Sequence, residues 1–154
     1  MKPMNPCIFL IALFILLGGC LSPPFQKPTV HVTDAQLTSI SLSEADIDVV
    51  TTITNPNPVG ATLNKLAFDL YYQDINSEWA YLGHGEQYNI TIRANGDTPV
   101  TVPVSVRNIP TVNAILTTAV NGFLNIRVRG SASIDTPIGI LDLPFDEYET
   151  ITIP

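Results

Sequence analysis

Cysteine and positive charge are both scarce in this sequence. It contains two cysteines, Cys7 and Cys20, and its 7 lysines and arginines are outnumbered by 14 aspartates and glutamates, for a formal net charge of −7. Because both cysteines lie near the N-terminus, the rest of the chain has no disulfide framework, catalytic cysteine or thiolate metal site. The absence of a basic run argues against a nucleic-acid partner and against electrostatic binding to anionic lipids.

Motifs that support catalysis or metal binding are also missing. No serine occupies a Gly-x-Ser-x-Gly elbow, and no glycine-rich loop lies between a strand and a helix to hold phosphate. His31 and His84 are each isolated from any Cys, Asp or Glu at ligand spacing. His84 is close to Glu86 in "GHGE", but one such pair is a poor metal site without further ligands. The sequence therefore predicts a protein without catalytic residues, metal or cofactor.

Acidic side chains occur in two groups. Asp46 and Asp48 share one face of a predicted strand, because residues two apart in a strand point the same way. Four more acidic residues fall within 142–149. Oxygen-rich groups of this kind can hold calcium, although solvated acidic surfaces are far commoner. A solvated acidic surface is the prediction, and calcium binding is the alternative.

The N-terminus "MKPMNPCIFLIALFILLGGC" has the layout of a secretory signal, with an early lysine, a short apolar run and small residues before a cut. The run from Cys7 to Leu17 is too short to span a bilayer, which needs about 20 apolar residues. Leu17-Gly18-Gly19-Cys20 resembles the lipobox of lipoproteins, whose cysteine receives a diacylglyceryl group and becomes the new N-terminus. We therefore expect cleavage between Gly19 and Cys20 and acyl chains, such as palmitate, on Cys20. An ordinary signal with an incidental cysteine, or an uncleaved anchor, is the alternative.

This interpretation divides the chain into three parts. Residues 1–19 form the signal peptide, residues 20–29 contain the lipidated cysteine and the proline-rich tether "LSPPFQKPT", and residues 30–154 form one domain. The protein is then extracytoplasmic and reaches the membrane through its lipid. Because Leu21 and not an aspartate follows the cysteine, the outer membrane is the expected destination if the host is Gram-negative.

Beyond the tether, apolar and polar residues alternate almost to the end of the chain. Alternation with a period of two is typical of half-buried β-strands. "ANGDTP" contains Asn-Gly, the strongest short hairpin signal, and "DTPIG" at 135–139 predicts a second hairpin. The predicted strands cover residues 30–42, 46–54, 65–73, 79–82, 87–94, 99–107, 125–134, 138–144 and 148–153.

One segment follows a different period. Val112, Ile115 and Leu116 have the spacing of one helix face, which predicts a short helix at 111–121. A proline just before it and a glycine just after it suit the two ends of such a helix. Short strands with regular turns and one-sided alternation indicate a mainly β protein. The predicted fold is an antiparallel β-sandwich of the immunoglobulin or fibronectin type III kind, with this one helix.

"TNPNPVG", residues 54–60, interrupts the alternation between two predicted strands. Prolines cannot donate to a ladder, so Pro56 and Pro58 mark where a strand ends or turns a corner. Asparagine side chains hydrogen-bond nearby backbone in tight turns. Asn55 and Asn57 are therefore expected to satisfy backbone groups that the prolines leave without ladder partners. Their predicted role is structural, and a ligand site built on the two amides is the alternative.

With these motifs the chain resembles the type 2 late-embryogenesis-abundant family, also called the water-stress and hypersensitive-response (WHy) domain. The likeness rests on Asn55-Pro56-Asn57, on the following "LNKLAFDLYYQD", on the small-residue turn "YLGHGE" before "YNITIRANGDTPVTVPVSV", and on one helix before the last hairpin. It covers about residues 30–154. The resemblance implies that the Asn-Pro-Asn triplet is a fold signature of a β-sandwich.

The same resemblance implies a non-catalytic role. The expected function is protection of envelope proteins or membranes under desiccation, osmotic or similar stress, through weak contacts with partly unfolded protein clients. The alternative is an interaction module with one dedicated partner in an envelope or secretion assembly, for example by strand addition at an exposed sheet edge.

Aromatic residues are concentrated in the middle third of the chain. Packing in the core and across strands is the prediction for them. A platform that stacks a sugar or a peptide is the alternative. The residues are Tyr71, Tyr72, Trp79, Tyr81 and Tyr88.

Overall fold

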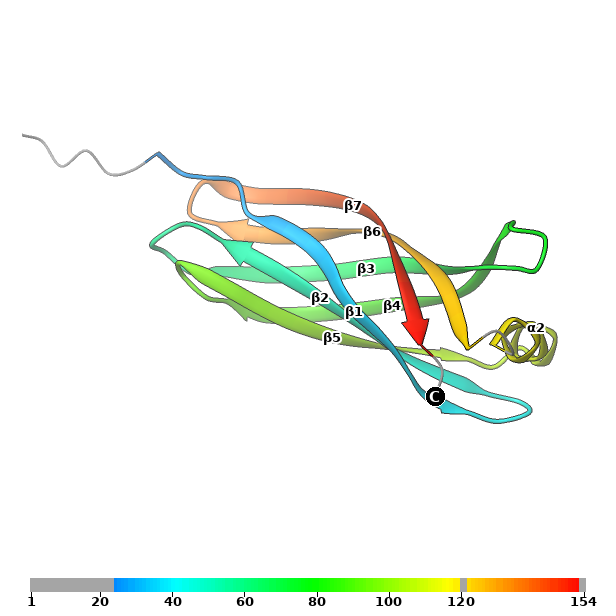
Figure 1. Ribbon diagram of the computed structural model, residues 1–154. Helices are drawn as coiled ribbons and strands as arrows, with labels where there is room; N and C mark the ends of the chain where they lie inside the picture. Colours follow the sequence, from blue (N-terminus) through cyan, green and yellow to red (C-terminus); the bar gives the residue numbers. More distant parts are fainter. Residues whose placement is uncertain (1–23, 120–121, 153–154) are drawn as a thin grey trace, which may run out of the picture.

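The computed structural model describes residues 24–119 and 122–152, which form two stacked antiparallel β-sheets (Figure 1). One sheet has the strand order β1-β2-β5 and the other the order β4-β3-β6-β7. The predicted sandwich is confirmed. No helix among these residues is long and apolar enough to cross a membrane. The elements are β1 (Thr29–Ile40), β2 (Ala45–Asn55), β3 (Ala61–Gln73), β4 (Trp79–Ile92), β5 (Gly96–Val106), α2 (Ile109–Ala119), β6 (Phe123–Thr136) and β7 (Gly139–Thr152).

The hydrophobic core lies between the two sheets and is built by alternation. In β2, Ile47, Val49 and Ile53 are fully buried. The residues that alternate with them point to the opposite face of the sheet and are half-buried. Phe68 of β3 is among the largest fully buried side chains, and its ring meets that of Phe145 edge-on, with 6.4 Å between centroids. All described core residues lie between residues 30 and 151. A chain that begins at residue 21 therefore keeps the complete sandwich.

The strands are fewer and longer than the alternation predicted, because two expected breaks are absent. Residues 79–92 form one strand, β4, and residues 139–152 form another, β7. The turn expected at "YLGHGE" is therefore wrong. A Cβ at Gly83 would lie 2.7 Å from Val104 Cγ1 on the opposite sheet, and one at Gly85 would lie 2.7 Å from Phe68 Cζ. Glycine marks a close approach of core side chains here, and not a turn.

The Asn-Gly turn also differs from its prediction. Asn95 adopts the expected left-handed backbone, with φ of 49°. However, β4 and β5 belong to different sheets, so the hairpin expected at "ANGDTP" is wrong. An Asn-Gly pair favours a tight reversal, but it does not decide which strands pair. Here β3 pairs with β4 and β2 pairs with β5, so the reversal connects the two layers. The hairpin predicted at 135–139 is confirmed, with Thr136 opposite Gly139.

The helix α2 begins two residues earlier than predicted, and residues 120–121 lie outside the described residues. Asn108 explains the earlier start. Its carbonyl accepts from the Val112 N–H at 2.9 Å, and its side-chain oxygen accepts from the Thr111 N–H at 3.4 Å, as an N-cap does. Val112 and Ile115 are fully buried, so the predicted apolar face covers one end of the core (Figure 1).

Three of the four outer strands carry residues that interrupt a free edge. β5 contains Pro99 and Pro103, and β7 contains Pro144. Proline has no N–H and is confined to edge strands or bulges, where its ring faces away from the ladder. In β4, Asn89 has a left-handed φ of 56°, which breaks the regular extended backbone. These features weaken pairing with a further strand.

The fourth outer strand, β1, is closed by a side chain from the other sheet. Its pairing with β2 shifts register twice, which bends the strand. The Val32 N–H donates to Glu147 Oε2 at 2.7 Å, and His31 Nδ1 lies 2.8 Å from the other oxygen of this carboxylate. Glu147 belongs to β7, which runs beside β1 at this side of the sandwich. The carboxylate therefore occupies an N–H that an added strand would need.

Candidate functional site

Gly19 and Cys20, the expected cleavage and lipid-attachment residues, lie outside the described residues. The described chain enters β1 at the end of the sandwich opposite α2 (Figure 1). The last residues of the tether contact the domain, since Pro28 is buried and the backbone of Gln26 is hydrogen-bonded to Asn57. The tether therefore reaches the domain at the Asn-Pro-Asn triplet.

Asn55 and Asn57 form a buried pair, which we call the asparagine clamp. Asn55 is 1% exposed and Asn57 is 5% exposed. The backbone N–H and the side-chain amide of Asn57 both donate to Asn55 Oδ1, at 3.1 and 2.9 Å. Asn55 Nδ2 donates to the carbonyl oxygens of Val59 and Arg93, at 3.0 and 2.9 Å. One side chain thus joins the loop after β2 to the end of β4.

Asn57 extends the clamp to the tether and to the β4–β5 turn. Its side chain accepts from the Gln26 N–H at 2.8 Å and donates to the Gln26 carbonyl at 2.6 Å, as a neighbouring strand would. Its backbone carbonyl accepts from the Asn95 N–H at 2.9 Å. Pro56 and Pro58 are exposed and have no N–H that needs a partner. The two amides are thus bonded mainly within the protein, which leaves little capacity for a ligand.

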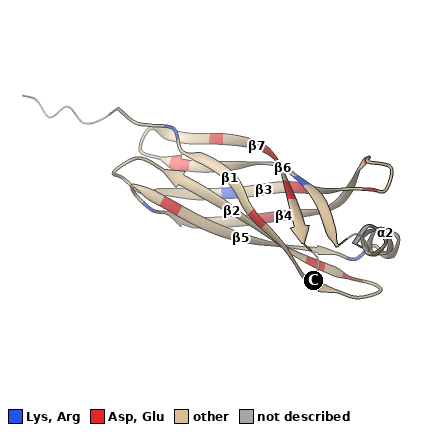
Figure 2. Ribbon diagram, viewed as in Figure 1, with Lys and Arg blue, Asp and Glu red and all other residues tan. Residues whose placement is uncertain are grey.

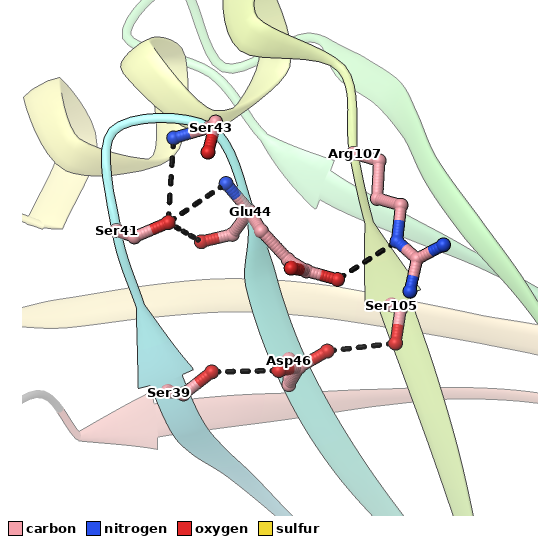
Figure 3. A network of polar contacts seen from close by, with 7 residues as sticks. All are labelled: Ser39, Ser41, Ser43, Glu44, Asp46, Ser105 and Arg107. Carbon is pink, nitrogen blue, oxygen red and sulfur yellow. Dashed lines mark hydrogen bonds and ion pairs between the residues drawn. The ribbon is translucent and has the colours of Figure 1, made fainter.

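Asp46 is held by the strands on both sides of β2 (Figure 3). Ser39 Oγ and Ser105 Oγ each donate to one of its carboxylate oxygens at 2.7 Å. These hydrogen bonds, first that from Ser39, lower the pKa of Asp46 because they stabilise the charged form. Next to them, Arg107 Nε donates to Glu44 at 2.8 Å. Asp46 therefore belongs to a polar network that crosses the three-stranded sheet.

The acidic residues of β7 point to opposite faces of their sheet. Arg127 donates two hydrogen bonds to Asp146, at 2.7 and 2.5 Å, and these bonds hold the pKa of Asp146 below its ordinary value. Glu147 points the other way, toward β1. Over residues 24–119 and 122–152, no three His, Cys, Asp or Glu side chains gather as metal ligands would. Acidic residues are instead spread along both sheets (Figure 2).

The clustered aromatic residues divide between the core and the outer face of the four-stranded sheet. Only Tyr72 is in the core, at 6% exposure. Tyr81 and Tyr88 are largely exposed, and Tyr71 and Trp79 are half-buried on the same outer face. The predicted core packing therefore holds for Tyr72 alone, because alternate residues of a strand point to opposite faces. The predicted cross-strand packing holds for Tyr71 and Tyr81, whose rings meet edge-on at 5.8 Å.

A further aromatic residue on this face comes from the last strand. Tyr148 is 59% exposed, and its ring centroid lies 5.4 Å from that of Trp79, with the planes tilted by 54°. The guanidinium of Arg127 lies over the Tyr148 ring at 5.5 Å. The bond to Asp146 raises the pKa of Arg127. Tyr148 was not part of the predicted cluster, because only the strand order β4-β3-β6-β7 brings it to Trp79.

Trp79 and Tyr148 line a hollow of about 360 Å³, which we call the aromatic hollow. Three polar residues of its lining are hydrogen-bonded in series from β7 to β6 to β3. Thr150 Oγ1 donates to Asn125 Oδ1 at 3.0 Å, and Asn125 Nδ2 donates to Gln73 Oε1 at 3.1 Å. We call these three residues the amide ladder. The hollow is lined by Gln73, Trp79, Asn125, Ile126, Tyr148, Glu149 and Thr150.

Comparison with known proteins places the chain in a family. Residues 50–148 match the LEA type 2 family model, described as late embryogenesis abundant protein. An uncharacterized protein of Methanocaldococcus jannaschii is 28% identical over 145 residues, which cover 94% of this chain and 79% of that protein.

Solved structures agree with the fold. The solution structure of a protein from Arabidopsis thaliana has a TM-score of 0.61 and 18% identity, over 90% of this chain and 89% of that chain. The solution structure of a putative late embryogenesis abundant (LEA) protein has a TM-score of 0.57 and 15% identity, over 97% of this chain and 83% of that chain. Because the family model spans more than half of the sequence, this chain belongs to the late embryogenesis abundant type 2 family, and this membership indicates a stress-related, non-catalytic protein.

Proposed function

We propose that this protein is an extracytoplasmic lipoprotein whose sandwich protects envelope proteins or membranes during desiccation or osmotic stress. The observation that carries this proposal is the family match over residues 50–148. The domain surface supports it, because acidic side chains are spread over both sheets (Figure 2). A net charge far from zero keeps such a domain soluble and self-repelling while water is withdrawn. It can then contact partly unfolded clients weakly without aggregating with them.

The lipid anchor has a physical role in this proposal. A domain tethered at a membrane surface has a high local concentration there, so weak contacts with neighbouring proteins suffice. Cys20 carries the acyl chains, and the proline-rich residues after it act as a semi-rigid spacer. The spacer ends at the asparagine clamp, where Gln26 is bonded to Asn57. In this arrangement the clamp end of the sandwich faces the membrane and α2 points away from it.

The anchor is tested by the variant Cys20→Ser, which removes the sulfur that would be lipidated. We expect unprocessed precursor to accumulate, because the serine oxygen does not take the diacylglyceryl group. For the wild-type protein, mass spectrometry of the membrane fraction should show a chain that begins at residue 20 with at least two acyl chains. One chain binds a membrane only marginally, whereas two bind stably at about 0.8 kcal/mol per buried methylene.

Cys7→Ser is the matched control, because Cys7 lies in the predicted signal peptide and is removed with it. This variant should be processed and anchored like the wild type. Mature protein that begins at another residue and washes off membranes contradicts the anchor.

Protection is tested with soluble protein from residue 21 onward. We expect it to reduce aggregation of labile enzymes during drying or freeze–thaw, at roughly stoichiometric ratios and without nucleotide or metal, because the effect comes from weak, local contacts. Light scattering and recovered enzyme activity measure the result. The control is an unrelated acidic β-sandwich of equal size and charge. Equal protection by this control would show generic crowding and defeat the proposal.

The alternative function, an interaction module with one dedicated partner, is constrained by the strand edges. Strand addition is unfavourable, because Pro99 and Pro103 interrupt β5 and the Glu147 carboxylate occupies the β1 edge. These edges favour a partner that binds a sheet face. Recovery of one tight envelope partner by cross-linking, together with protection no better than that of the control domain, would favour this alternative.

A further inference from the structure

The aromatic hollow is a preformed site. The Trp79 and Tyr148 rings lie with their centroids 5.4 Å apart and their planes tilted by 54°, and the residues of the amide ladder line the same hollow. Gln73 Nε2 also lies 3.4 Å from the Ser77 carbonyl oxygen, so the ladder is tied to the β3–β4 loop as well. Both amides are therefore fixed before any ligand arrives. A site that does not need to order its own side chains loses less entropy on binding.

The ladder retains hydrogen-bonding capacity of both kinds. The Asn125 amide nitrogen carries two hydrogens, and its bond to Gln73 uses one of them. The Asn125 oxygen has two lone pairs, and its bond from Thr150 uses one. Trp79, which carries an indole N–H donor, also lines the hollow. A complementary ligand has an apolar face for the rings and closely spaced groups that both donate and accept.

We propose that the aromatic hollow binds a pyranose ring of a saccharide. Each sugar hydroxyl both donates and accepts, which matches the ladder. The C–H groups on a pyranose face are apolar and slightly positive, which suits the electron-rich ring of Trp79 and the side of Tyr148 that Arg127 does not cover. A volume of about 360 Å³ lies at the lower end of small-molecule sites and suits one or two sugar rings. Tyr71 and Tyr81 extend the aromatic surface on the same sheet for a further unit.

The same contacts disfavour two other ligands of aromatic surfaces. A quaternary ammonium would meet Arg127, whose guanidinium already lies over the Tyr148 ring. A proline-rich peptide offers carbonyl acceptors but few donors, so the side-chain oxygens of Gln73 and Asn125 would lose water without gaining a hydrogen bond. A saccharide avoids both costs. The hollow lies where β4 begins, away from the end that receives the tether (Figure 1), so a bound glycan would be held outward from the anchor.

Binding can be measured directly, because Trp79 is the single tryptophan of the chain and its fluorescence reports on the hollow. The full chain is purified in lauryldimethylamine oxide, a detergent without a sugar headgroup. It is titrated with glucose and with the tetramers of β-linked glucose, α-linked glucose and N-acetylglucosamine. Sorbitol, which has hydroxyls but no ring, is the negative control. We expect a saturable emission change at millimolar concentration or below with at least one tetramer, and none with sorbitol.

The arms of this titration distinguish the source of the ligand. Equal affinity for glucose and for a tetramer indicates a free sugar, and affinity that rises with length indicates a polymeric glycan. Tyr148→Ala should weaken binding at least 10-fold, because it removes one of the two aromatic rings that line the hollow. Tyr88→Ala is the matched control, since Tyr88 is an exposed tyrosine of the same sheet face outside the hollow lining. It should leave the affinity unchanged.

Both tyrosines are exposed, so circular dichroism and thermal melting should show that each variant is folded. The proposal is overturned by the absence of a saturable change with every saccharide, or by an equal response to sorbitol. It is also overturned if Tyr148→Ala binds like the wild type, or if a proline-rich peptide saturates the emission change while no sugar does.

Discussion

Asn55→Ala is expected to lower the free energy of unfolding by about 3 kcal/mol, although it removes only a small polar side chain. The Asn55 amide makes four hydrogen bonds at 1% exposure: it donates to the Val59 and Arg93 carbonyls and accepts twice from Asn57. Without this side chain, the Asn57 N–H has no hydrogen-bond acceptor in a buried site that water scarcely reaches. Urea unfolding of the chain from residue 21, followed by circular dichroism, measures the loss.

Two further variants calibrate this effect. Asn57→Ala should cost less, about 2 kcal/mol, because its partner Gln26 is exposed and can bond to water instead. Asn76→Ala, in the exposed loop between β3 and β4, is the control and should change stability by less than about 0.5 kcal/mol. If Asn55→Ala is as stable as the Asn76 variant but has lost binding to a ligand, the clamp is a site and not a structural element.

Asn55→Asp tests the direction of the hydrogen bonds. The new carboxylate oxygen would face the carbonyl oxygens of Val59 and Arg93, which need a donor. Burial and this repulsion raise the pKa of the aspartate in the folded state above its unfolded value of about 3.9. The variant should therefore be most destabilised near neutral pH and should recover part of the loss, relative to wild type, as pH falls through the raised pKa. A pH-independent difference would show that the amide donates little.

The role of the triplet could be predicted only in part. Asparagine next to proline indicates local hydrogen bonding, and the contact of the Asn57 N–H with Asn55 Oδ1 is of this local kind. The partners Gln26, Arg93 and Asn95 could not be predicted, because they lie far away in the sequence and approach only when β1 and β5 pair with the two sides of β2. The sequence motif supplies the two asparagines of the clamp, and the tertiary fold supplies most of their hydrogen-bond partners.

The sandwich itself could be predicted because alternation reports which face of a strand is buried, as in β2. Strand pairing could not, because it depends on competition between strands. Asn95 and Gly96 make the expected reversal, yet β2 takes the ladder edge of β5. The aromatic hollow could not be predicted for the same reason. Trp79 and Tyr148 lie on β4 and β7, and only the sheet order β4-β3-β6-β7 places these two strands in one sheet. The periodicity of a single strand predicts which of its residues are buried, whereas only the sheet topology shows which strands lie side by side.

The largest destabilisation by a single added methyl group is expected at Gly130. This glycine lies on β6 between Phe68 and Phe145, which flank it on the neighbouring strands. A Cβ at this position would overlap the Ala67 carbonyl oxygen and would lie 2.5 Å from Phe68 Cβ and 2.7 Å from Phe68 Cα. Because the obstacles are mainly backbone and the root of a side chain, no rotamer change removes the overlap. The strands β3 and β6 must separate locally, at the centre of the four-stranded sheet.

We therefore expect Gly130→Ala to cost at least about 3 kcal/mol, which corresponds to a fall of roughly 10 °C in Tm for a domain of this size. Gly85→Ala should cost about 1–2 kcal/mol, because the atoms it meets, Phe68 Cζ and Val102 Cγ1, are ends of side chains that can shift. Gly96→Ala is the matched control, since the nearest atom to its Cβ is the Ala94 carbonyl oxygen at 3.7 Å. Thermal melting of the three variants should rank them in this order. A Gly130 variant as stable as the Gly96 variant would mean that β3 and β6 yield easily, and that Phe68 does not depend on the glycine beside it.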